Sequence, residues 1–245
     1  MKGKIHSIET LGLRDGPGVR FVAFLQGCRL RCAYCHNPDT WSMGGGTETE
    51  ADELLKKALR FKPYFDRSGG GVTCSGGEPL MQPDFLINFL RKCKAAGIHT
   101  AVDTAGFGIG RYAEILKYTD LVILDIKHVD SRGYKQLTGG DINEFHRFAD
   151  EVRKSGKKVW LRHVVVPGKT DSSGHMKKLG RIIESFENVE RIELLPYHTL
   201  GVSKYEAMGV RYPLEGVYPM NTETTRSYEK ELNDNLQSLQ DIIRS

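Results

Sequence analysis

Six short apolar runs, separated by amphipathic or polar stretches, constrain the fold of this chain more than any other feature. They are rich in Val, Ile and Leu and end at Gly, Pro or charged residues, which is typical of strands buried on both faces. The runs cover Val19 to Leu25, Val72 to Cys74, Thr100 to Asp103, Leu121 to Ile126, Val159 to Val166 and Ile192 to Leu195. Because helices join such strands, we predict an α/β protein with a parallel sheet.

The stretches between these runs carry helical signals. Thr47, with Glu50 three positions later, has the spacing of a capping box before an apolar stripe. Gly97 is placed to end a helix that begins near Pro83. Further helices are predicted over about 112–118, 142–155, 175–186 and 224–244.

Periodicity alone leaves the curvature of the sheet open. A doubly wound open sheet and a curled barrel both alternate strands with helices. Both also place their ligands at the carboxyl ends of the parallel strands. We therefore expect the functional residues where the predicted strands end.

The composition indicates one cytoplasmic domain. The chain has 245 residues, 39% of them hydrophobic, which is within the range of a single α/β barrel. A net charge of +4 without a basic run argues against nucleic-acid binding. We find neither the apolar core of a signal peptide nor an apolar run of membrane-spanning length. Five cysteines, three of them in one loop, do not suggest a disulfide framework.

Three cysteines in one short segment can turn their thiolates toward one metal centre: Cys28, Cys32 and Cys35. A [4Fe-4S] cluster is usually held by four cysteines, so three would leave one iron free to bind a small molecule. Structural zinc is the alternative, but it needs a fourth ligand. His36 adjoins Cys35 and is poorly placed to supply one, while Cys74 and Cys93 lack the spacing of a second ligand pair.

Polar side chains and glycines follow the other predicted strands. In chain order they are the 75–79 turn (Ser-Gly-Gly-Glu-Pro), Asp103, Asp125, Lys127, Arg162 and His198. Acidic and basic groups at neighbouring strand ends suit a zwitterionic ligand. Each also has an ordinary alternative: a tight turn, a helix N-cap, a salt bridge or a structural histidine.

Together these segments resemble the radical S-adenosylmethionine (SAM) superfamily, and most specifically its pyruvate formate-lyase activating enzymes. The segments that carry the resemblance are 15–20, 26–28, 35–41, 75–79, 103–107, 125–127, 164–168 and 195–198. The resemblance spans nearly the whole chain and thins after about Tyr212. It implies one radical SAM domain over 1–245, a partial TIM-type (β/α)6 barrel. The core would cover about 15–200, and a helical extension about 213–245.

The resemblance also implies a role for each candidate residue. The three loop cysteines would hold a [4Fe-4S] cluster whose open iron binds SAM. The SAM contacts would be Tyr34, His36, Gly76, Gly77, Glu78, Asp103, Asp125, Ile126, Lys127, Arg162 and His198. A monovalent cation would lie near the SAM carboxylate, held by Asp103, Thr104 and Asp125. Asp15 would lie beside a peptide of the partner.

The implied reaction is the reductive cleavage of SAM to methionine and a 5'-deoxyadenosyl radical, which takes a hydrogen atom from a glycine of pyruvate formate-lyase. A reduced flavodoxin or ferredoxin-type protein would supply the electron, and the chain would act as a monomer. The segment 41–53 contains no cysteine and so lacks the additional clusters of other glycyl-radical activases. Two alternatives stay open: a radical SAM enzyme acting on a small molecule, and a non-catalytic, metal-stabilised binding protein.

Overall fold

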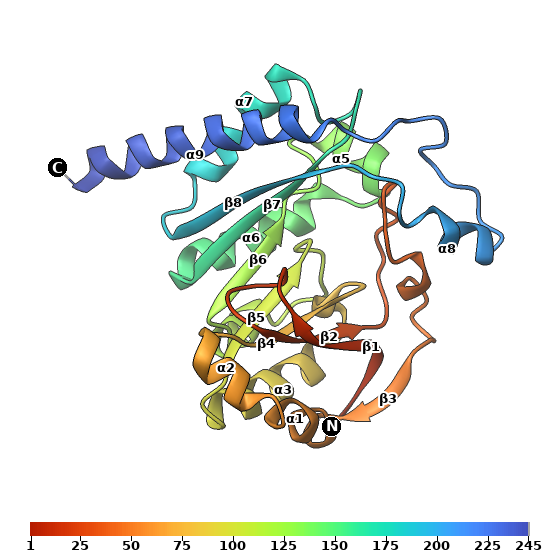
Figure 1. Cartoon of the computed structure of the whole chain (residues 1–245), viewed down its shortest axis with the longest axis vertical. Coiled ribbons are helices and arrows are strands. Elements are labelled where there is room, and N and C mark those ends of the chain that lie inside the picture. Colours follow the sequence, from red (N-terminus) through yellow and green to blue (C-terminus); the bar gives the residue numbers. More distant parts are fainter. Residues whose placement is uncertain (245) are drawn as a thin grey trace.

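One eight-stranded sheet organises the chain, in the spatial order β3-β1-β2-β4-β5-β6-β7-β8. The computed structural model describes residues 1–244, with side chains up to residue 238. Over this range the sheet curls without closing, and β3 and β8 form its two edges (Figure 1). The predicted α/β class and partial barrel are thereby confirmed.

Six strands pair in parallel and coincide with the six predicted runs. They are β2 (Arg20–Leu25), β4 (Gly71–Gly76), β5 (His99–Thr104), β6 (Leu121–Asp125), β7 (Lys158–Val165) and β8 (Val189–Pro196). β6 is rich in Val, Ile and Leu over its buried part, as expected for a strand covered on both faces, whereas β4 and β5 contain a single Val each. Because all six strands are parallel, their carboxyl ends meet at one edge of the sheet.

Two further strands correct the sequence prediction at the N-terminal side. β1 (Lys2–Gly12) pairs antiparallel with β2, and the short β3 (Thr47–Glu50) pairs antiparallel with β1. The prediction of a capping box at Thr47 is wrong, because that residue pairs with Ile5 in the sheet. Helix α1 (Ala51–Leu59) begins only after Glu50, whose side chain makes no capping hydrogen bond.

Five helices of the described chain lie close to their predicted positions: α3 (Pro83–Ala95), α4 (Tyr112–Lys117), α6 (Ile142–Ser155), α7 (Ser173–Glu184) and α9 (Thr222–Arg244). Gly97 adopts the left-handed conformation just beyond the end of α3 (φ 68°), as predicted for a terminating glycine. Other helical segments were not predicted: α2 (Lys62–Ser68), α5 (Ser131–Thr138), α8 (Val202–Ala207) and the 3₁₀ turns Pro38–Thr40 and Pro79–Met81. None of these has an apolar stripe long enough to be distinct in the sequence.

Side-chain alternation along the strands sets which residues face the inside of the curled sheet. A separate small apolar cluster there contains Ala101, Leu121, Ile123 and Trp160. Successive side chains of a strand point to opposite faces, so residues two positions further along face the same way. Asp103 therefore follows Ala101 inward, Asp125 follows Ile123, and Arg162 follows Trp160.

The C-terminal helix α9 covers the edge strand β8 and projects beyond the body of the molecule at its C-terminal end (Figure 1). Glu229 accepts a hydrogen bond from the backbone N–H of Leu194 at 2.7 Å, and Leu232 is buried in the main core. An edge strand protected in this way is less open to pairing with another chain. Residues 213–221 of the predicted helical extension are not helical, and residue 245 lies outside the described residues. Within residues 1–244, no helix is both long enough and apolar enough to span a bilayer.

Candidate active site

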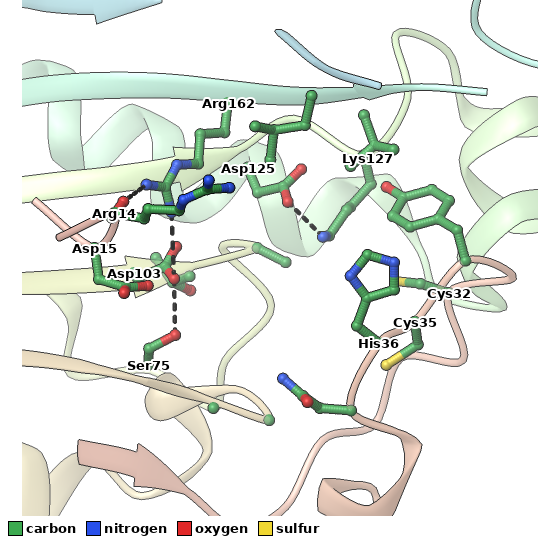
Figure 2. Close-up of a pocket in the computed structure, with 18 of the residues that line it drawn as sticks. Arg14, Asp15, Cys32, Cys35, His36, Ser75, Asp103, Asp125, Lys127 and Arg162 are labelled. Carbon is green, nitrogen blue, oxygen red and sulfur yellow. Dashed lines mark hydrogen bonds and ion pairs between the residues drawn. The ribbon is translucent and has the colours of Figure 1, made fainter. Parts of the chain in front are cut away.

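A cavity of about 640 Å³ opens at the carboxyl ends of the parallel strands, and all six of these strands contribute to its wall. Small-molecule sites typically occupy roughly 300–1,000 Å³. Figure 2 shows that Cys32, Cys35 and His36 lie at one end, while Asp15 and Asp103 lie at the other. The cavity therefore has a sulfur-rich end and a charged end.

The loop after β2 is anchored to helix α5 and presents its thiols to the cavity. The backbone N–H groups of Arg31 and Ala33 donate to the carbonyls of Thr138 and Leu137, at 2.7 and 2.8 Å. These bonds fix the middle of the loop against the end of the helix. The loop brings the three cysteines of the predicted cluster site to the cavity wall: Cys28, Cys32 and Cys35. The other two cysteines, Cys74 and Cys93, are fully buried away from the cavity.

Burial raises the pKa of all three loop thiols, to about 12 at Cys32, where the ammonium of Lys127 opposes the effect. The Glu78 carboxylate and neighbouring thiols raise the pKa of Cys28 further. Iron binds the thiolate form, which burial disfavours. The positively charged iron of a cluster must therefore stabilise the thiolates. No three His, Cys, Asp or Glu side chains among the described residues are placed to hold a single metal ion. A [4Fe-4S] cluster takes each thiolate on a separate iron, so the three-thiol set fits one with an open iron.

The glycine turn after β4 packs directly on the strand that leads into the cysteine loop. The N–H of Gly77 donates to the Leu25 carbonyl at 2.8 Å, and that of Glu78 to the Gly27 carbonyl at 2.9 Å. A Cβ on Gly77 would lie 2.6 Å from the Gly27 oxygen, and Gly76 has a φ of 116°. Only glycine accommodates both conditions without displacement. The two glycines, which were predicted to contact SAM, also line the cavity.

Two predicted SAM contacts, Glu78 and Ile126, lie behind the cavity wall, and each is only 1% exposed. The Glu78 carboxylate accepts hydrogen bonds from the Leu80 N–H at 3.1 Å, the Thr104 hydroxyl at 2.5 Å and the Ala105 N–H at 2.9 Å. Burial raises the pKa of Glu78 to about 7 although these bonds oppose it. The carboxylate therefore stabilises the loop after β5 through these hydrogen bonds.

Asp125 and Lys127 form an ion pair in the middle of the cavity wall, with Lys127 Nζ 2.6 Å from Asp125 Oδ2 (Figure 2). Burial acts to lower the pKa of Lys127, but the charges of Asp125, Tyr34 and Cys32, together with the hydrogen bond to Asp125, hold that pKa well above its usual value. The Lys127 ammonium also lies 5.4 Å from the centre of the Tyr34 ring. Asp125 Oδ1 and the Tyr34 hydroxyl are buried without a hydrogen-bond partner within the described structure. Unpaired polar atoms of this kind fit a ligand that carries hydroxyl groups.

The charged end of the cavity is a network around Arg162. Its Nε lies 2.5 Å from Glu193 Oε2 and its Nη1 3.6 Å from Asp103 Oδ2. Asp103 also accepts a hydrogen bond from the Ser75 hydroxyl at 2.7 Å (Figure 2). Burial, followed by the Asp103 charge, raises the pKa of Asp15 to about 6. The network can therefore bind a positive group or hold a proton near neutral pH.

His36 and His198 lie at the sulfur-rich end and stack on each other, with ring centroids 4.0 Å apart. Burial lowers the pKa of both imidazoles, and the neighbouring His198 lowers that of His36 further. Both rings are therefore neutral at pH 7 and offer flat faces to an aromatic ligand. Lys204 of α8 holds the segment after His36 by donating to Asn37 Oδ1 at 2.9 Å.

The predicted cation ligands, Asp103, Thr104 and Asp125, all line the cavity but have protein partners. The Thr104 hydroxyl donates to Glu78, and Asp125 pairs with Lys127. The cation site therefore stays a prediction.

Every predicted site residue except Glu78 and Ile126 lines the cavity. Sequence reasoning missed wall residues that alternate along the last two strands: Trp160 and Val164 on β7, and Arg191, Glu193 and Leu195 on β8. Their period-two spacing was the available signal, but we interpreted both runs as buried on both faces. A polar residue at every second position of an otherwise apolar strand would have indicated the cavity side.

Comparison with known proteins agrees with this geometry. Residues 22–179 match the model of the radical SAM superfamily. A pyruvate formate-lyase-activating enzyme of Clostridium pasteurianum is 60% identical over 96% of this chain and 99% of its own length. Another, from Listeria monocytogenes, is 47% identical over 88% of this chain and 90% of its own.

A solved structure supports the same assignment. A domain of a pyruvate-formate lyase-activating enzyme from Bacteroides vulgatus superposes with a TM-score of 0.55 at 25% identity, covering 68% of this chain and 94% of that domain. Radical SAM enzymes use a [4Fe-4S] cluster and SAM, for which the cavity carries fitting groups. This chain belongs to the radical SAM superfamily and, within it, to the family of pyruvate formate-lyase-activating enzymes.

Proposed function

We propose that this chain activates a pyruvate formate-lyase under anaerobic conditions, by creating a radical on one of its glycines. One observation carries the proposal beyond family membership. Among the described residues, three thiols and no fourth cysteine face a cavity of ligand size, with a buried ion pair beside them. This arrangement suits a cluster that must leave one iron open.

Cys28, Cys32 and Cys35 would hold the cluster. When bound there, the reduced cluster would supply the one electron that cleaves SAM to methionine and the 5'-deoxyadenosyl radical, and that radical would take a hydrogen atom from a glycine Cα. The protein's part is to bind SAM in one orientation and to keep water from the reacting carbon.

The residues along the cavity wall would bind different parts of SAM. Asp103, at the charged end, would contact the amino-acid end together with Gly76 and Gly77, and Asp125 and Lys127 would contact the carboxylate and ribose. Lys127 stays protonated at Nζ because Asp125 raises its pKa. The unpaired Asp125 Oδ1 is free to accept from a ribose hydroxyl.

The aromatic groups at the sulfur-rich end would receive the adenine. His36 and His198 stack there as neutral rings, and Tyr34 lies beneath Lys127. Flat, uncharged faces bind a nucleobase by stacking without a cost of desolvating charge. Arg162 would balance the charge of the acidic groups around the methionine end.

The charged end would receive the glycine loop of the partner, with Asp15 beside the peptide. Leu13 and Leu195 line the cavity and are 74% and 40% exposed, so they can pack against an incoming chain. The partner must present its glycine on a segment that moves out of its own fold, because a buried glycine cannot enter the cavity.

The remaining parts of the proposal concern the setting of the reaction. A reduced flavodoxin or ferredoxin-type protein would supply the electron, and the chain would act as a monomer with a single domain over 1–245. Five free cysteines, three of which need to stay reduced to hold the cluster, suit the cytoplasm.

The test is to reconstitute the protein with iron and sulfide without oxygen, reduce it, and add SAM and a pyruvate formate-lyase. A glycyl radical signal in electron paramagnetic resonance, dependent on SAM and on the partner, is the expected result. Cleavage of SAM without any radical on the partner would contradict the proposed substrate, and absence of cleavage would contradict the proposed chemistry.

A further inference from the structure

Three buried histidines lie behind the cavity wall and have no part in the function proposed above. His128, His163 and His175 are 8%, 1% and 6% exposed, and none of them lines the cavity. The His163 and His175 rings stack with centroids 5.0 Å apart, and His128 meets His175 edge-on at 4.7 Å. Buried polar groups are normally hydrogen-bonded, so the partners of these ring nitrogens indicate what the histidines do.

His163 contacts the end of β6, where two cavity residues flank one core residue. Its Nδ1 lies 2.5 Å from the carbonyl oxygen of Ile126, the residue between Asp125 and Lys127. The N–H of Ile126 donates to the Arg162 carbonyl at 2.8 Å. Strand β7 therefore holds both backbone groups of Ile126, one through its own backbone and one through the imidazole.

These contacts permit only one arrangement of protons. A carbonyl oxygen can only accept, so His163 must carry its proton on Nδ1, and a neutral imidazole then has Nε2 as an acceptor. His175 Nε2 lies 3.2 Å from His163 Nε2 and must be the donor. Burial lowers the pKa of His163 to about 4 and that of His175 to about 3, the latter also through the neighbouring His163. Both rings are thus neutral at pH 7, as this arrangement requires.

We infer that His163, oriented by His175, is a positioning residue that fixes the Asp125–Lys127 segment for SAM binding. The inference rests on the proposed function, in which these two side chains contact SAM. Their ion pair is only 2.6 Å long, and one carboxylate oxygen is left free for the ligand, so a small shift of the backbone at Ile126 moves both groups. Binding groups must be held within about 0.5 Å of the productive geometry.

Four variants separate hydrogen bonding from packing. In His163→Asn the amide nitrogen replaces Nδ1 as donor to the Ile126 carbonyl, whereas His163→Leu has no donor. In His175→Gln the amide nitrogen replaces Nε2 as donor to His163, whereas His175→Leu does not. SAM affinity is measured by anaerobic calorimetry on proteins with equal iron and sulfide content, together with thermal unfolding.

We expect both Leu variants to bind SAM about tenfold or more weakly, in line with the roughly 10–100-fold effects of residues that orient ligating groups. The Asn and Gln variants should stay within a few-fold of the wild type. Equal loss of affinity in His163→Asn and His163→Leu, or unchanged affinity in both Leu variants, would overturn the inference. Failure of the wild type to bind SAM would instead contradict the proposed function.

A second measurement does not depend on the cluster or on SAM. Nitrogen-15 NMR of the histidine rings in the metal-free protein reports which nitrogen carries the proton. The inference requires the proton of His163 on Nδ1 and that of His175 on Nε2. Protonation of His163 on Nε2 would overturn it, even if the variants lost affinity.

Discussion

Replacing Arg162 with methionine would remove the buried guanidinium that pairs with Asp103 and Glu193 at the charged end of the cavity. The guanidinium lies 2.5 Å from Glu193 Oε2 and 3.6 Å from Asp103 Oδ2, and its charge also lowers the pKa of Asp15. Its side chain is only 10% exposed, so water can replace little of the stabilisation that the guanidinium gives to the neighbouring carboxylates. Methionine keeps a similar length but leaves the neighbouring carboxylates facing one another.

The magnitude follows from these distances. Two unit charges 3.6 Å apart attract by about 5 kcal/mol at an effective dielectric constant of about 20. Part of this gain offsets the cost of burying the groups, and breaking a buried pair by removing one partner typically costs about 3–5 kcal/mol. Arg191 stays 2.9 Å from Glu193 but is 55% exposed, so it compensates weakly. We therefore expect a loss of about 3 kcal/mol, or roughly 6–12 °C in Tm for a chain of this length.

The dependence on pH distinguishes this cause from a loss of packing. The folded-state pKa of Asp15 is already raised to about 6, mainly by burial, and removing Arg162 raises it further. When folding raises the pKa of a carboxyl group, the protein loses stability as the pH rises through the folded-state pKa, and regains it when the group is protonated. The destabilisation of Arg162→Met should thus be largest near about pH 8 and shrink toward about pH 5.

Thermal unfolding of the metal-free protein across this pH range is the assay, with Arg147→Met as a matched control. Arg147 pairs with Glu144 at 2.8 Å on the surface of α6, and its side chain is 69% exposed. Removing such a pair should cost less than about 1 kcal/mol. The reasoning is refuted if Arg162→Met loses no more stability than the control, or loses the same amount at both ends of the pH range.

Three further predictions follow from the wall of the cavity. Alanine in place of any loop cysteine (Cys28, Cys32 or Cys35) should abolish the iron–sulfur absorbance and SAM cleavage. Alanine in place of Cys74 or Cys93 should leave both intact. Gly77→Ala should destabilise the apoprotein by about 1–3 kcal/mol in chemical unfolding, because the new Cβ meets the Gly27 oxygen at 2.6 Å; Gly174→Ala in α7, with no neighbour within 4 Å, should be neutral or stabilising. Lys127→Met should weaken SAM binding in calorimetry by about 1–3 kcal/mol, because Asp125 is left unpaired; unchanged affinity would make the pair purely structural.

Much of the fold was predictable because parallel strands have a strong local signature. The six parallel strands are short, apolar and bounded, so composition alone marks them. β3 escaped prediction because its sequence, Thr-Glu-Thr-Glu, is polar and pairs only at the sheet edge with β1. Tertiary pairing overrides a local capping signal in such a segment.

Site residues could be predicted where their role depends on residue type. They could not be predicted where the role depends on the direction in which the side chain points. Cysteines, strand-end acids and glycines stand out in the sequence, and the structure brings them to one cavity. Glu78 could not be placed, because its carboxylate turns away to accept bonds from Thr104 and Ala105, which lie 26 and 27 residues later. Glu193 and Trp160 were missed because their role depends on which face of the curled sheet is hollow.

The central claim is that the radical formed here takes hydrogen from a peptide glycine, and isotope transfer tests it most directly. The reduced, reconstituted protein is given SAM and a short peptide of the partner's glycine loop, with deuterium on the glycine Cα. Deuterium should appear in the 5'-deoxyadenosine product, and a glycyl radical should form in the peptide. If SAM is cleaved while all label stays in the peptide, and a small metabolite transfers its own hydrogen efficiently instead, the account is contradicted.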